Sequence, residues 1–93
     1  MLLTLERGGN IATLVRGASG GSRIVLIPAT LDPLAMAQAR AAIGPLAIEL
    51  APAVRVNAVV ATEGADPADV DAAVTFLENA PSTTGQLLDV TRG

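Results

Sequence analysis

Three short apolar segments predict the strands of a buried sheet. Residues 23–27 read Arg-Ile-Val-Leu-Ile, and residues 54–60 read Val-Arg-Val-Asn-Ala-Val-Val. Nearly continuous runs of β-branched residues are typical of strands in a parallel sheet, where helices cover both faces. Residues 86–90 read Gln-Leu-Leu-Asp-Val, and we expect a third strand there.

The segments between these strands carry the pattern of amphipathic helices. Asp32-Pro33 and Asp66-Pro67 each place a capping side chain before a proline at the first helical position. Apolar residues then recur at helical spacing, which predicts helices over residues 33–51 and 67–79. Gly44-Pro45 lies inside the first helix. We expect a kink or a break there, because proline lacks the backbone N–H that a helix needs.

The order strand–helix–strand–helix–strand predicts the fold class. Short connections between alternating elements favour right-handed crossovers and a mainly parallel sheet. We therefore expect an α/β protein, a truncated Rossmann-like fragment with three layers, that forms one small domain over residues 1–93.

Residues 1–21 are expected to be a variable N-terminal segment. The apolar pieces Leu2–Glu6 and Ile11–Val15 flank Gly8-Gly9-Asn10, which favours a β-hairpin with a glycine-rich turn. The alternative is one irregular helix interrupted at the two glycines, where glycine is unfavourable.

Composition excludes several classes of function. The 93 residues contain no cysteine and no histidine, and all six basic residues are arginine, so disulfides, thiolate metal sites and lysine Schiff bases are ruled out. A net charge of −3 and a single aromatic residue argue against nucleic-acid binding. No apolar run is long enough for a membrane span. We expect a cytoplasmic protein with no membrane or metal partner, and the alanine-rich, lysine-free composition favours a bacterial source.

Five segments, in order and at nearly regular spacing, carry a family resemblance. The chain resembles the C-terminal half of the short-chain dehydrogenase/reductase family over roughly residues 22–93. The resemblance implies the last three strands of a Rossmann-type sheet and the helices between them. The five segments are Arg23–Ile27, Leu46–Pro52, Val54–Val59, Asp66–Val70 with Phe76-Leu77, and Thr84–Gln86.

The departures from the family pattern concern its chemistry. The resemblance places the family's serine at Ala29 or Thr30, its tyrosine at Asp32 and its lysine at Met36. Gly17–Gly21 looks like a phosphate loop, but it precedes its strand, and a dinucleotide loop needs a helix immediately downstream. We therefore expect no catalytic residue, no nucleotide cofactor and a capping role for Asp32.

Other charged residues are interpreted as structural. Glu63, Asp66, Asp69 and Asp71 cluster at a predicted helix start, where acidic side chains favour the helix dipole, so a cap and a solvated first turn are preferred to a cation site. The resemblance implies structural roles for Arg55 and Asn57, and Arg40 is expected on the surface.

These observations favour a protein that acts by association. The first hypothesis is a non-catalytic family member that serves as an oligomerising or partner-binding subunit. The second is a subunit of an NAD(P)-dependent oxidoreductase whose active site is completed by another chain, such as a full-length reductase. A folded fragment without a role is the third.

A homo-oligomer, a dimer or larger, is expected because so small a parallel sheet needs cover on both faces and leaves an unpaired edge. Edge-to-edge pairing through Leu2–Glu6 is one route. The expected interface is otherwise a stripe of small residues on the helix over residues 33–51, where two helices approach closely: Ala35, Ala39, Ala42 and Leu46.

Overall fold

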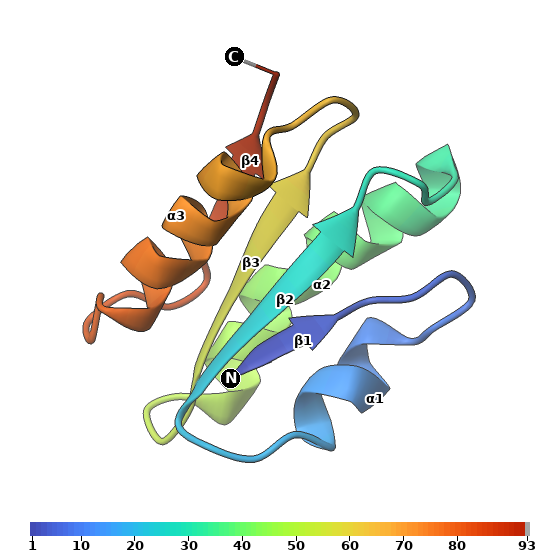
Figure 1. Ribbon diagram of the computed structural model, residues 1–93. Helices are drawn as coiled ribbons and strands as arrows, with labels where there is room; N and C mark the ends of the chain where they lie inside the picture. Colours follow the sequence, from blue (N-terminus) through green and yellow to red (C-terminus); the bar gives the residue numbers. More distant parts are fainter. Residues whose placement is uncertain (93) are drawn as a thin grey trace.

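The computed structural model of this protein describes residues 1–92. Strands and helices alternate along the chain, which confirms the predicted α/β class (Figure 1). The elements are β1 (Leu2–Thr4), α1 (Ile11–Arg16), β2 (Ser22–Pro28), α2 (Pro33–Leu50), β3 (Arg55–Ala61), α3 (Pro67–Glu78) and β4 (Leu87–Val90).

Within residues 1–92 the sheet has four parallel strands in the order β1-β2-β3-β4, so β1 joins the three strands that were predicted for the parallel sheet. The central pair β2 and β3 is joined over seven residues, with Val25 opposite Ala58. Leu2 of β1 lies opposite Ile24 of β2. The longest strands are thus the two that the apolar runs predicted, and shorter strands form both edges.

The predicted N-terminal hairpin is wrong, and so is the interrupted helix that was its alternative. β1 runs parallel to β2, and residues 11–16 form a helix. The reason is local: the Asn10 side chain accepts a hydrogen bond from the Thr13 N–H at 3.0 Å, which is the geometry of a helix N-cap. Ile11 and Val15, four residues apart, are then both buried on the side of α1 that faces the sheet.

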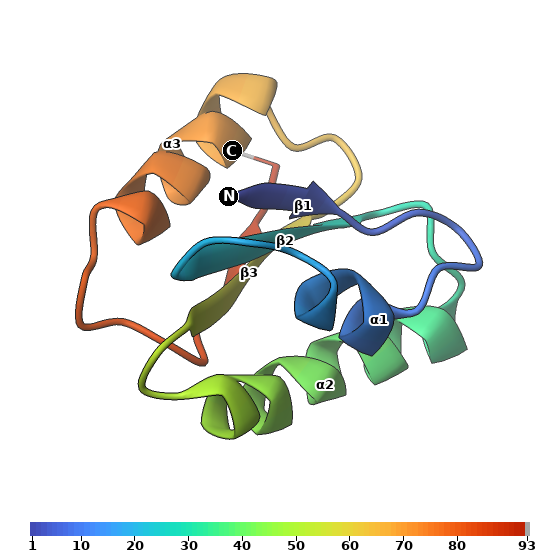
Figure 2. The same cartoon turned by 90° about the horizontal axis from the view of Figure 1, so that it is seen from below.

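Helices cover the two faces of the sheet unequally. Figures 1 and 2 show α1 and α2 on one face and α3 alone on the other. The larger core cluster joins α1 and α2 to one set of strand residues, including Val25, Ile27 and Val56. The smaller cluster joins α3 to the opposite set, including Ile24 and Val59. The predicted three layers are therefore present.

One crossover departs from the predicted handedness. The strands follow each other in sequence order, yet α3 packs on the face opposite α2. The crossovers through α1 and α2 are right-handed, so the one through α3 is left-handed, an arrangement that is rare in parallel sheets. The physical reason is burial: with α1 and α2 on one face, α3 is the helix that removes Ile24 and Val59 from water on the other.

Of the kink or break predicted at Gly44-Pro45, the break does not occur. α2 is one helix of 18 residues, and Pro45 lies on its exposed side. Residues on both sides of the proline, Ala39 and Ile43 before it and Leu46 and Ala47 after it, are buried in the same core cluster. Packing of this continuous stripe against the sheet holds the helix together through the missing hydrogen bond.

Candidate functional site

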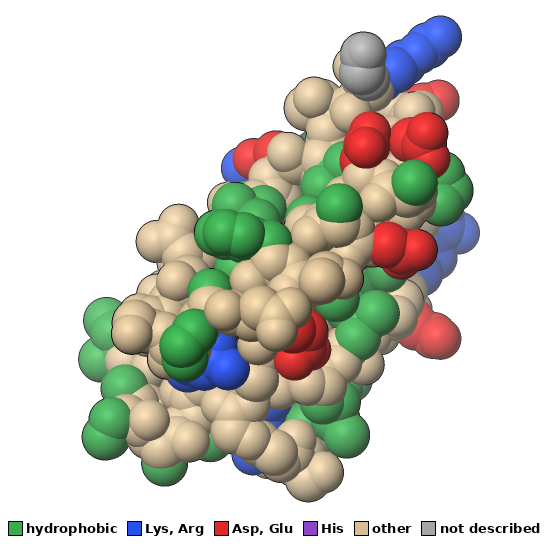
Figure 3. Space-filling model, turned by 60° about the vertical axis from the view of Figure 1, so that its left-hand side comes forward, with side chains coloured by type: hydrophobic (Ala, Val, Ile, Leu, Met, Phe, Trp, Pro, Cys, Tyr) green, Lys and Arg blue, Asp and Glu red, His purple; other side chains and the backbone are tan. Residues whose placement is uncertain are grey.

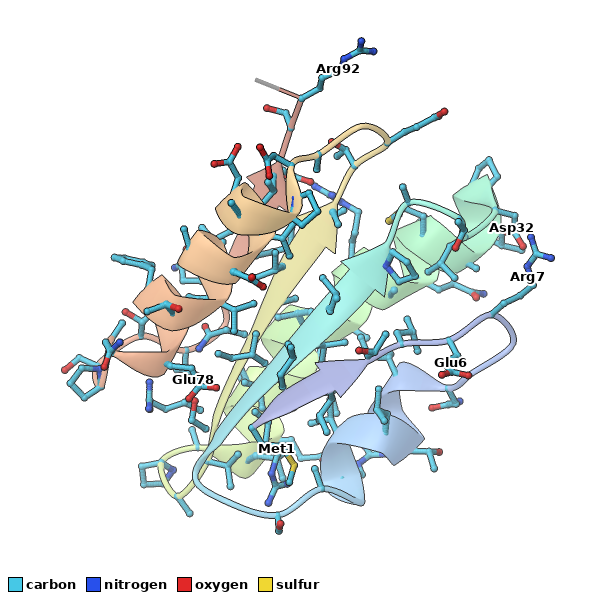
Figure 4. All side chains as sticks on the ribbon, viewed as in Figure 1. Met1, Glu6, Arg7, Asp32, Glu78 and Arg92 are labelled. Carbon is cyan, nitrogen blue, oxygen red and sulfur yellow. The ribbon has the colours of Figure 1, made fainter. Side chains whose placement is uncertain are left out.

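A cleft opens at the carboxyl ends of β1 and β2, where parallel sheets usually bind their ligands. It lies between the loop that follows β1 and the first turns of α2, and its volume is about 530 Å³. Figure 4 shows Glu6, Arg7 and Asp32 gathered at this end of the molecule. The walls combine glycine backbone, apolar side chains and four polar side chains, namely Glu6, Asn10, Asp32 and Gln38.

Asp32 stands at the position that the resemblance assigns to the family's tyrosine, and its carboxylate caps α2. Its Oδ1 accepts a hydrogen bond from the Ala35 N–H at 2.8 Å, and Pro33 stands at the first helical position. The side chain thus satisfies a backbone donor that the helix itself leaves free. The predicted capping role is confirmed.

The other positions that the resemblance assigns to the family's catalytic residues hold side chains of a different kind. Met36, at the position of the lysine, is half-buried and packs against the larger core cluster. Ala29 and Thr30, at the position of the serine, are exposed in the turn after β2. The hydroxyl of Thr30 therefore has neither a phenol nor a lysine beside it from the matching positions, and nothing there raises its nucleophilicity.

Sequence reasoning missed the contribution of the N-terminal segment to this cleft. Glu6 and Asn10 line it because β1 ends beside β2 and α1 turns back under the sheet. Two signals pointed to that arrangement: Asn10 is a preferred capping residue, and Ile11, Leu14 and Val15 follow at helical spacing. The hairpin prediction made no use of either signal.

The cleft is equipped for hydrogen bonding. Glu6, Asn10, Asp32 and Gln38 are exposed, and the oxygens of Asn10 and Asp32 already accept from their own helices. Within residues 1–92, no group of three or more acidic or other ligating side chains is arranged to hold a metal ion. The polar groups can orient a small polar molecule.

The glycine-rich loop over residues 17–21 lies at the other end of the sheet. Gly17 closes α1, and the loop leads into the amino end of β2. Arg23 anchors it by donating to the carbonyls of Gly20 at 3.2 Å and Val15 at 3.0 Å. No helix start follows the loop, so it lacks the N-terminal N–H groups that hold a pyrophosphate.

The acidic residues near α3 serve its first turn. Asp66 accepts a hydrogen bond from the Ala68 N–H at 2.8 Å and caps the helix. Asp69 lies in the first turn, and Glu63 and Asp71 are exposed. This arrangement agrees with the cap-and-solvated-turn interpretation.

Arg55 and Asn57 join β3 to the end of α3 and the loop that follows it. Arg55 donates to the carbonyl of Ala80 at 2.6 Å, just past the carboxyl end of α3. Asn57 is fully buried; its Nδ2 donates to the Thr83 carbonyl and its Oδ1 accepts from the Gln86 N–H, both at 3.0 Å. Both side chains therefore hold the β3–β4 crossover in place, as the resemblance implied.

The expected interface residues are divided between core and boundary. Ala39 and Leu46 are 2% and 4% exposed and pack against the sheet, so these two side chains are unavailable to a partner in this fold. Ala35 and Ala42 are half-buried. The opposite side of α2 is the one that meets solvent, with Leu34 68% and Ile48 80% exposed.

The basic side chains at the surface and the apolar content of the helices agree with what the composition indicated. On the face drawn in Figure 3, basic side chains are few and separated, and hydrophobic patches lie between them. In the described part of the chain, no helix is both long enough and apolar enough to cross a lipid bilayer.

Comparison with known proteins identifies the family. A family model described as short chain dehydrogenase-like protein matches residues 9–90, so the likeness begins in the N-terminal segment and not at residue 22 as expected. No curated protein and no solved structure gave a match. Because the family model spans α1 to β4, nearly the whole chain, this protein belongs to the short-chain dehydrogenase-like family.

Proposed function

We propose that this chain is a non-catalytic member of its family that acts in the bacterial cytoplasm as an oligomerising or partner-binding subunit. The observation that carries the proposal is the unequal cover of the sheet, with two helices on one face and one on the other. A parallel sheet is stable when both faces are covered, and a second protein can supply the missing cover.

Exposed apolar side chains support this role. Met1, just before the edge strand β1, is 49% exposed, Leu2 within that strand is 47% exposed, and Phe76 of α3 is 60% exposed. Exposed patches of large apolar side chains mark sites where proteins associate. Association would also offset the small core of a 93-residue chain.

The positions that match the family's catalytic residues support a non-catalytic role. Asp32 caps α2, and Met36 packs against the core. The chain contains no lysine, so it lacks the residue type that, as the resemblance implies, holds a cofactor's ribose in the family.

Two measurements test the proposal. Sedimentation equilibrium at micromolar protein should report a dimer or a larger species. Titration with NADH or NADPH, followed by nicotinamide fluorescence, should show no binding up to millimolar cofactor, with a full-length family reductase as the positive control. A well-folded monomer would remove the association, and saturable micromolar binding of either cofactor would remove the non-catalytic role.

The cleft favours a second candidate, a subunit whose active site is completed by another chain. It opens at the carboxyl edge of the sheet, where a dinucleotide fold places its ligand, and it adjoins the open edge of β1. A full-length reductase from the same genome, mixed with this chain, should then gain NAD(P)H-dependent activity or cofactor affinity. An unchanged reductase at saturating amounts of this chain would exclude that role.

A further inference from the structure

The two edges of the sheet differ in how they are protected. At β4, Asp89 is charged and its carboxylate is held by Arg40 of α2 at 2.6 Å, which blunts that edge. At β1, none of the residues Leu2–Thr4 is charged or proline, and Leu2 is 47% exposed. By the usual criteria for edge strands, β1 is therefore the edge that invites pairing.

The hydrogen bonds of β1 show which backbone groups remain free. The Met1 carbonyl accepts from the Ile24 N–H and the Leu5 N–H donates to the Leu26 carbonyl, both at 2.9 Å. Peptide directions alternate along a strand, so Leu3 also faces β2, whereas the N–H and C=O groups of Leu2 and Thr4 point outward. Among residues 1–92, β1 pairs with β2 alone, so no strand of the described chain lies beside these outward groups.

The outward-facing backbone groups of β1 can pair with the same groups of a second copy of β1. If a second copy approaches antiparallel, Leu2 faces the partner's Thr4 and Thr4 faces the partner's Leu2. In such pairs each residue exchanges both of its backbone hydrogen bonds with the residue opposite, so every outward group is satisfied. Along the paired edge, each N–H of one strand meets a C=O of the other, so opposite partial charges face each other. No charged side chain lies opposite a side chain of like charge.

We infer that two copies of this chain pair antiparallel through β1, centred on Leu3, and join their sheets into one continuous sheet. This inference rests on the association proposed above and names its partner and register. On the dyad, Leu3 lies opposite the partner's Leu3 in a non-hydrogen-bonded pair. Leu2 and the partner's Thr4 then lie side by side on the face that α3 leaves open, where exposed apolar surface is removed from water.

The first test removes an outward donor without touching the fold of one copy. Thr4→Pro deletes an N–H that faces solvent, a position at which proline is tolerated in an edge strand. Thr4→Val keeps the N–H and is the matched control. Sedimentation equilibrium should show that Thr4→Pro weakens the dimer by about tenfold or more, since hydrogen bonds are lost at both ends of the dyad. Thr4→Val should leave it unchanged, and the circular dichroism of both should match the wild type.

The second test determines the register of the two β1 strands by a disulfide cross-link. Because the chain has no cysteine, a single Leu3→Cys substitution gives the only thiol. Opposed residues of a non-hydrogen-bonded pair lie about 4.5 Å apart at Cα, within the range of about 4.4–6.8 Å that a disulfide spans. Leu3→Cys should therefore form a covalent dimer under mild oxidation. Leu2→Cys should not, since its own copy lies on the diagonal at about 7–8 Å.

The outcomes separate this inference from the broader proposal. A monomeric wild type would overturn both. A wild-type dimer that survives Thr4→Pro, or that fails to cross-link at Leu3→Cys, would overturn the β1 pairing and leave association standing. Leu88→Cys, at the equivalent centre of the β4 edge, is the remaining control. Cross-linking there and not at Leu3→Cys would place the interface at the opposite edge and also overturn the inference.

Discussion

The guanidinium group of Arg40 holds the carboxylate of Asp89 through two hydrogen bonds, at 2.6 Å and 3.1 Å, and ties α2 to the edge strand β4. Arg40 was expected to be a surface residue. It is exposed, and it also makes these two hydrogen bonds to the edge strand β4. The hydrogen bond from Arg40 lowers the pKa of the Asp89 carboxyl below its ordinary value.

This pair predicts a small pH-dependent contribution to stability. A carboxyl whose pKa is lowered by folding stabilises the folded chain above its unfolded pKa, about 4, and loses that effect as the pH falls through the folded pKa. Both side chains are 41% exposed, so Asp89→Asn should lower the free energy of unfolding by no more than about 1 kcal/mol at pH 7. Urea denaturation should show the difference at pH 7 and its disappearance near pH 2. Asp71→Asn, an exposed aspartate on α3, should have little effect at either pH.

The capping role of Asp32 predicts a contrast between two substitutions. Asn caps a helix about as well as Asp, so Asp32→Asn should leave the free energy of unfolding nearly unchanged. Asp32→Ala removes the oxygen that accepts from the Ala35 N–H and should cost about 1 kcal/mol. Chemical denaturation of the two variants beside the wild type measures the difference. Equal and large losses from both would mean that the negative charge matters, which the cap does not require.

Asn57 should be among the least replaceable residues of the chain. It is fully buried, and it serves as both donor and acceptor for the segment that leads into β4. Asn57→Ala leaves the Thr83 carbonyl and the Gln86 N–H without their partner, which should cost about 2–3 kcal/mol. The control is Asn79→Ala, which removes an exposed side chain that donates to the Thr75 carbonyl at 2.9 Å. Thermal melts should separate the two variants clearly, and similar melting temperatures would contradict the buried role.

Substitutions on the two sides of α2 should have different consequences. Ala39 is buried against the sheet, so Ala39→Arg forces a charge into the core and should destabilise each copy by more than about 3 kcal/mol. Ala41→Arg lies on the exposed side and should leave the fold intact. Circular dichroism and sedimentation together read out both effects. A folded Ala41→Arg variant that becomes monomeric would show that copies associate through the exposed side of α2, against the pairing inferred for β1.

The central elements of the fold could be predicted because their signals are local. The predicted segments over residues 23–27 and 54–60 match β2 and β3 to within a residue at each end. The Asp-Pro pairs start α2 and α3 at the predicted residues, since a cap acts on N–H groups two or three positions away. The capping role of Asp32 and the family itself were likewise available from residue types and their spacing, and the structural role of Asn57 was implied by the family resemblance.

The remaining features depend on contacts between distant parts of the chain. Whether Leu2–Thr4 folds back as a hairpin or pairs with β2 is decided by partners more than twenty positions away, such as Ile24. The face that α3 covers is decided by which apolar residues α1 and α2 leave open.

The orientation of α2 also depends on contacts between distant parts of the chain. Alanine is compatible with either side of a helix, so sequence alone placed Ala39 in an interface, whereas the structure buries it against the sheet. Sequence by itself therefore determined the family, the central strands and the caps, because those follow from neighbouring residues. Only the tertiary structure decided the fourth strand, the side taken by α3 and the buried side of α2, because burial of apolar surface is settled by the whole chain at once.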